Sequence, residues 1–314
     1  RNYKPGVFTT FLGYEWAKWR QNGDGDRNVY YLRDDGELYR SETGEYDRPN
    51  KLFEALKEQD SIVIPHHTAY EGNFCDWSQH DPRVERLVEI YSVFGSSERS
   101  AAQGNPYPVR TGQSHDPRWL RVSGEKPELA EYPTGFVQEC LARGWRVGFT
   151  GGGDKHCSHP GDEVRSGYPP LDYKPGLTGV WSSNNNREKI WRSLRDRRCY
   201  ATTGARMILR ISVNGHPMGS EFAMEKDETR SIDLTASGTS RIGSVELVRN
   251  NEVLAVEKPN RFDAKLHWTD PEPFDSVALP STVWSEKPYI FYYVRVGQVD
   301  GEMGWSSPVW VEME

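Results

Sequence analysis

The feature that most constrains the fold is the glycine-rich stretch at residues 148–162, GFTGGGDKHCSHPGD, which follows an apolar segment. An apolar run that ends in three glycines predicts a buried strand and then a tight loop, because glycine allows positive φ and close backbone approach. Asp154 and His156 lie two residues apart, so their side chains point the same way in an extended segment. Together they could reach one cation, or they could cap a turn and form a local hydrogen bond.

The composition limits the class of protein and its partners. The chain has 314 residues and a formal net charge of −7, which argues against general binding to nucleic acid or to an anionic membrane. No apolar run is long enough to span a bilayer. We therefore expect a small-molecule substrate, with no nucleic-acid or membrane partner. The chain begins with Arg1 and not with Met, so we expect missing upstream sequence, and the compartment (cytoplasmic or periplasmic) stays open.

Helix and strand patterns alternate in the first two thirds of the chain. Residues 49–60 and 134–143 carry apolar residues at helical spacing, and each segment precedes a short apolar strand. Further strands are predicted at residues 8–14 and 84–91. Polar groups follow or lie within these strands, and a parallel α/β sheet or barrel gathers functional groups in this way at the ends of its strands.

A further helix is predicted at residues 187–197, with Asn185 and Asn186 as candidate caps. The pattern changes at about Met207, where short alternating runs separated by turns, among them 208–213, 231–235 and 244–248, replace the helical periodicity. This spacing predicts an all-β sandwich of about 110 residues. We therefore expect two domains: an α/β metal-binding domain at residues 1–205 and a β-sandwich domain at residues 206–314.

The predicted strand ends carry a mixed set of carboxylates and imidazoles. Such a set suits Zn²⁺, Mn²⁺ or Fe²⁺ better than Mg²⁺, which prefers oxygen ligands and several waters. The candidate metal ligands are Glu15, His66, His67, Glu89, Asp154 and His156.

The motifs GYEW (13–16), GDRNV (25–29), IPHHT (64–68), VEIYS (88–92) and GGGDKHCSHPG (151–161) resemble those of the PHP (polymerase and histidinol phosphatase) superfamily. The resemblance is greatest to a branch of unknown function that has carbaryl hydrolases among its relatives. It implies a distorted seven-stranded βα barrel for the first domain. It also implies that Glu15 is a bridging carboxylate. PHP enzymes begin with a His-x-His motif, but no His precedes Glu15, so either that segment lies upstream or this copy has lost it. We favour the first alternative and expect that the first strand or strands are missing from this chain.

The resemblance implies a metal-dependent hydrolase, of bacterial and phosphoesterase-like type, that cleaves a phosphate ester or another small ester or carbamate. Two to three divalent ions would activate a water molecule, with Asp154 and His67 as catalytic residues. The candidates that bind the substrate are Arg27, Lys155 and His159. The alternative is a non-catalytic protein that binds a ligand or glycan and retains a degenerate metal site. Asp154 and His156 could also stabilise their loop and do nothing more.

Overall fold

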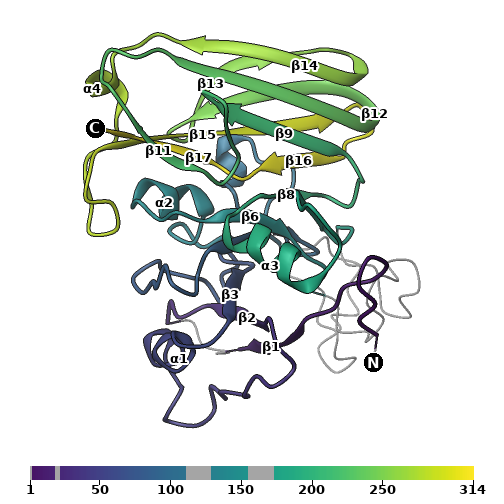
Figure 1. Ribbon diagram of the computed structural model, residues 1–314, viewed down its shortest axis with the longest axis vertical. Coiled ribbons are helices and arrows are strands. Elements are labelled where there is room, and N and C mark those ends of the chain that lie inside the picture. The colour runs from purple at the N-terminus through teal and green to yellow at the C-terminus, as the bar shows by residue number, and fades with distance from the viewer. Residues whose placement is uncertain (1, 18–21, 111–128, 155–172) are drawn as a thin grey trace.

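The computed structural model describes residues 2–17, 22–110, 129–154 and 173–314, and the strands in these ranges form three sheets (Figure 1). Two small sheets of three strands each come from the first half of the chain. One large sheet of eleven strands contains the rest. Among the described residues, no helix has both the length and the apolar character that crossing a bilayer requires.

The first small sheet is antiparallel and consists of β1 (Leu12–Trp16), β2 (Asp26–Tyr31) and β3 (Ser61–His66). Helix α1 (Pro49–Leu56) packs its apolar stripe against one face of this sheet, where Trp16, Val29 and Val63 are buried. Because side chains alternate along a strand, the residues between these core positions point to the opposite face. That second face carries the polar residues described below.

The second small sheet lies beside the first, with β4 next to β3. Its strands are β4 (Leu87–Ser92), β5 (Gly95–Ser96) and β6 (Gly148–Gly151), and β4 pairs with β6 in parallel. A 3-10 helix (Ala101–Gln103) follows β5, and helix α2 (Val137–Ala142) precedes β6. All residues of β4 are buried, so a charged group within it needs a compensating partner.

The large sheet curls through the upper part of the molecule and packs on the second small sheet, whereas the first small sheet lies at the lower end (Figure 1). Helix α3 (Arg187–Arg195) lies between β7 and β8, and helix α4 (Phe274–Val277) precedes β15. The eleven strands are β7 (Leu177–Val180), β8 (Cys199–Thr202), β9 (Ile208–Val213), β10 (His216–Pro217), β11 (Glu221–Met224), β12 (Arg230–Arg249), β13 (Glu252–Glu257), β14 (Arg261–Asp270), β15 (Tyr289–Gln298), β16 (Met303–Ser306) and β17 (Val309–Met313).

Strand β12 organises the large sheet because its 20 residues pair with four other strands. Its first part pairs with β9 and β14, and its last part pairs with β13 and β15. The register shifts between Ser237 and Ile242, and irregularities of this kind bend a strand and increase its twist. Because of this bend, β12 pairs with strands in both halves of the curled sheet.

The predicted α/β fold with a seven-stranded βα barrel is wrong. The described residues contain four short α-helices and are dominated by strands, most of which pair antiparallel. A βα barrel needs a parallel strand after every crossover helix, whereas β1, β2 and β3 pair antiparallel around a single helix. The predicted separate sandwich is also not observed, since β7 and β8 join the same curled sheet as the later strands. The domain boundary at residues 205/206 stays a prediction.

Candidate functional site

The two small sheets bring six acidic and imidazole side chains together. In an antiparallel ladder, directly paired residues point to the same face. Asp26 pairs with His66, and Glu15 pairs with Asn28, which in turn pairs with Ile64. Asp26 and Asn28 are two residues apart on β2 and so share a face. The side chains of Glu15, Asp26 and His66 therefore leave the same face of the first sheet, opposite helix α1. The second sheet adds Glu89 from β4 and Asp154 from the loop after β6. The cluster consists of Glu15, Asp26, His66, His67, Glu89 and Asp154.

His66 lies at the centre of this cluster. Its Nε2 atom is 3.5 Å from Glu15 Oε1, and its Nδ1 atom is 3.7 Å from Asp154 Oδ2 and 4.0 Å from Glu89 Oε1. The imidazole therefore faces carboxylates from three separate strands or loops. The Glu15 side chain is 33% exposed, so solvent reaches the cluster from the β1 side.

His67 adds a second imidazole from the end of the same strand. Its φ of 35° turns the chain sharply, and its ring lies against that of His66 with 4.0 Å between centroids. The Nε2 atom of His67 is 3.7 Å from Asp26 Oδ2 and 3.8 Å from Asp154 Oδ2. Asp154 also has a positive φ, 45°. Positive φ is uncommon outside glycine and costs energy, and such residues concentrate at functional sites.

Burial makes this cluster electrostatically costly. His66 is 1% exposed and Glu89 is 6% exposed. Neither ring nitrogen of His66 has a hydrogen-bond partner, and neither does Glu89 Oε1. Burial raises the pKa of the Glu89 carboxyl to about 8. Burial also opposes the charged form of His66, but the nearby carboxylates of Glu15, Asp154 and Glu89 prevail and raise its pKa to about 9. The cluster therefore favours additional positive charge.

The donor atoms suit a metal ion. Glu15, Asp26, His66 and His67 each offer one ligand atom, and these atoms all lie within 4.8 Å of one another. Two imidazole nitrogens and two carboxylates form a mixed nitrogen and oxygen set, as Zn²⁺, Mn²⁺ and Fe²⁺ prefer. Asn73 Nδ2 donates to Asp26 Oδ2 at 2.8 Å, which orients one carboxylate from outside the cluster.

Gly152 makes room for the Glu89 carboxyl. A Cβ atom at this position would lie 1.8 Å from Glu89 Oε2, so a Gly152→Ala substitution must push the carboxyl away. We expect the variant to fold and to bind Zn²⁺ about tenfold more weakly, as measured by competition with a chromogenic chelator. Gly44→Ala is the matched control, because a Cβ there meets nothing within 4 Å. Equal affinity in the two variants would show that the position of the Glu89 carboxyl does not affect the metal site.

Sequence reasoning found most of the cluster. The structure brings together Glu15, His66, His67, Glu89 and Asp154, all of which were predicted ligands. Asp26 was missed, and the structure places it at the start of β2, directly after Gly25. The predicted residues His156, Lys155 and His159 lie outside the described residues.

The structure does not bring Arg27, a predicted substrate-binding residue, into the cluster. Arg27 is 1% exposed on the face that packs against α1. Its Nε atom donates to Glu85 Oε1 at 2.8 Å, and its guanidinium lies over the Phe53 ring. Alternation along β2 explains the difference, because Asp26 and Arg27 must point to opposite faces.

Comparisons with known proteins give a family but no activity. The model of a family described as "Protein of unknown function (DUF3604)" matches residues 1–168 and 169–239. An uncharacterized protein of Chlamydia pneumoniae is 32% identical over 98% of this chain and 47% of its own length. One of Chlamydia trachomatis is 32% identical over 93% of this chain and 45% of its own length. The chain thus spans about half the length of these relatives.

A structural match carries no argument here. Fibronectin(III)-like modules of Clostridium thermocellum CbhA cover 33% of this chain and 93% of their own, with 12% identity and a TM-score of 0.21.

The predicted membership of the PHP superfamily is wrong. The matching family is the one of unknown function, and the described fold is mostly β with few helices, unlike a PHP barrel. The descriptions of the family and of its relatives name no activity, so they lend no support to the hydrolase or phosphoesterase expectation. Any function must be argued from the residues of the cluster itself.

Proposed function

This chain belongs to the DUF3604 family of proteins of unknown function, and we propose that its buried cluster binds a divalent metal ion and hydrolyses a small ester. One observation carries the proposal. The central imidazole of His66 is buried among carboxylates, and both of its ring nitrogens lack a hydrogen-bond partner. A buried polar group left in this state costs about 1–3 kcal/mol, and coordination to a cation removes the cost.

The ligands would be Glu15, Asp26, His66 and His67, with Zn²⁺, Mn²⁺ or Fe²⁺ as the ion. A divalent ion supplies Lewis acidity, which lowers the pKa of a bound water toward about 7 and polarises the scissile group. The predicted number of two to three ions stays part of the proposal.

The remaining two carboxyls of the cluster accept and donate protons. Asp154 Oδ2 lies within 3.8 Å of both imidazoles, where it can accept a proton from the attacking water. Glu89 has its pKa raised to about 8 by burial, so it exchanges a proton near neutral pH. Solvent access beside Glu15 gives a small substrate a route to these groups.

The test combines metal content with turnover. The protein at its natural length is purified, its bound metals are measured by mass spectrometry, and it is assayed with p-nitrophenyl acetate and bis(p-nitrophenyl) phosphate in the presence of Zn²⁺, Mn²⁺ or Fe²⁺. We expect stoichiometric metal and metal-dependent hydrolysis of one substrate. In the Glu15→Gln, His66→Gln double variant we expect loss of the metal and a fall in turnover of about a hundredfold or more.

The matched control is His267→Gln, which removes an imidazole from an exposed pair with Asp233. This variant is expected to keep both metal and activity. The proposal fails if the natural-length protein takes up none of the three ions, or if the double variant turns over substrate as fast as the control.

A non-catalytic binding protein is the second candidate. A separate pocket on the large sheet favours it, because that pocket has the volume and polarity of a ligand site. Stoichiometric metal without hydrolysis of either ester class would favour this candidate over the first.

A further inference from the structure

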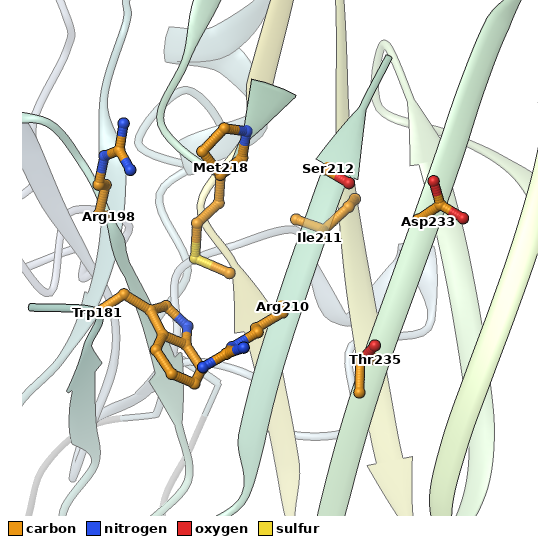
Figure 2. Close-up of a pocket in the computed structure, with 9 residues that line it drawn as sticks. Trp181, Arg198, Arg210, Ile211, Ser212, Met218, Asp233 and Thr235 are labelled. Atoms are coloured by element: carbon orange, nitrogen blue, oxygen red, sulfur yellow. The ribbon is translucent and has the colours of Figure 1, made fainter. Parts of the chain in front are cut away.

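A pocket of about 410 Å³ lies on the solvent-facing side of the large sheet, and it shares no lining residue with the metal cluster (Figure 2). This volume falls in the range of small-molecule sites. Its walls come from two regions. Strands β9, β10 and β12 form one wall, and residues next to β7 and β8 form the other (Figure 2).

The register of the large sheet determines the polar wall. Arg210 pairs with Thr235, and Ser212 pairs with Asp233, across the antiparallel β9–β12 ladder. Paired residues point to the same face, so these four side chains project together from the side opposite the buried Leu209 and Leu234. This wall therefore offers one guanidinium, one carboxylate and two hydroxyls.

The opposite wall is built around Trp181. Its indole N–H donates to the Leu209 carbonyl oxygen at 2.8 Å, which fixes the orientation of the ring. The guanidinium carbon of Arg210 lies 3.7 Å from the ring centroid, so the arginine reaches across and stacks on the tryptophan (Figure 2). Stacking of this kind holds a guanidinium in place while its N–H groups stay available.

The charges around this pocket are unbalanced. Within the described ranges, no hydrogen bond or ion pair reaches the guanidinium of Arg198 or of Arg210, although both line the pocket. The carboxylate of Asp233 already contacts His267, with 3.0 Å between Oδ1 and Nδ1. Two arginines without a carboxylate partner, one of them held in place by a tryptophan, suit an anionic group on a ligand.

The other lining residues indicate what carries the anionic group. Met218 and Pro217 supply apolar contact, and the hydroxyls of Ser212 and Thr235 supply hydrogen bonds. A sugar ring presents apolar C–H faces and hydroxyl edges at once. We infer that this pocket binds an acidic sugar of the uronate type, with its carboxylate toward Arg198 and Arg210 and its hydroxyls toward Ser212, Thr235 and Asp233.

The test compares D-glucuronate, D-glucose and benzoate by titration calorimetry at low and high salt. We expect glucuronate to bind, to weaken as salt screens the arginines, and to exceed both other probes. Arg210→Gln is expected to weaken glucuronate about tenfold. Arg206→Gln, an exposed arginine outside the pocket, is the matched control and should leave the affinity unchanged.

Four outcomes would overturn the inference. If glucose binds as tightly as glucuronate, the pocket does not require an anionic group on its ligand. If benzoate binds as tightly as glucuronate, the pocket does not require a sugar ring. Absence of glucuronate binding, or an equal loss in the Arg206 and Arg210 variants, would show that this pocket is not the site. Because Arg210 is exposed, its replacement leaves the folded chain available for the measurement.

Discussion

Replacing Glu98 with alanine is expected to lower the free energy of unfolding by about 3–5 kcal/mol, because it removes one partner of a buried ion pair. Glu98 is 3% exposed and follows the second small sheet. Its Oε1 atom accepts hydrogen bonds from Arg295 Nε at 2.5 Å and Tyr293 Oη at 2.7 Å. Its Oε2 atom accepts one from Trp305 Nε1 at 2.8 Å.

The size of the effect follows from where these partners lie. Arg295 and Tyr293 belong to β15 and Trp305 to β16, so a single carboxylate joins the second small sheet to the large one. Without Glu98, the buried Arg295 retains its part-exposed partner Glu246, and two aromatic donors lose their acceptor. Leaving buried polar groups unpaired costs far more than losing a surface contact.

Urea unfolding followed by tryptophan fluorescence and by far-UV circular dichroism measures this change. Lys51→Ala is the control, since Lys51 of α1 forms a surface ion pair with Asp47, which precedes the helix, and its loss should cost less than about 1 kcal/mol. Equal destabilisation by the two substitutions would show that Glu98 does not join the sheets as proposed.

Local patterns in the sequence predicted many elements of the fold correctly. The alternation at residues 208–213 coincides with β9, and helix α3 begins at Arg187 with Asn186 as its cap, as the sequence predicts. Strand β12 was predicted as two segments, 231–235 and 244–248, because the residues between them lack clear alternation. What no local pattern contains is the direction in which strands pair. The antiparallel pairing of β1, β2 and β3 depends on segments that are distant in the sequence. Because the direction of this pairing was misjudged, the predicted barrel was wrong.

In the cluster, too, local sequence predicts some residues, and only the pairing of strands places the others. Glu15, His66, Glu89 and Asp154 could be predicted because each lies in or just after an apolar strand, where a polar group is unexpected. Asp26 could not, since only its register with His66 places it there. Arg27 was predicted to bind substrate, but it lies one residue after Asp26, and in a strand one residue reverses the face.

Without bound metal, the free energy of unfolding is expected to fall as pH rises from about 4.5 to about 9, by on the order of 8 kcal/mol. Glu89 has a pKa of about 8 in the folded chain and about 4.5 unfolded, so the folded chain holds its proton more tightly. His66 has a pKa of about 9 when folded and 6.5 unfolded, and the same reasoning applies. In this window the folded state binds more protons than the unfolded state, so stability is greatest at low pH and is lost toward pH 9.

A bound divalent cation should reverse this trend, because it replaces the protons and its ligands must be deprotonated. Zn²⁺ at 100 times its dissociation constant would stabilise by about 2.7 kcal/mol, and this gain should grow from pH 6 to pH 8. Urea unfolding at pH 5, 7 and 9, after chelation and with Zn²⁺ restored, measures both trends. Glu89→Gln is the informative variant, since it removes the titrating carboxyl and should flatten the metal-free profile up to about pH 6.5, above which His66 still titrates. A metal-free chain whose stability stays level or rises toward pH 9, together with no Zn²⁺ effect at pH 8, would contradict the buried metal cluster itself.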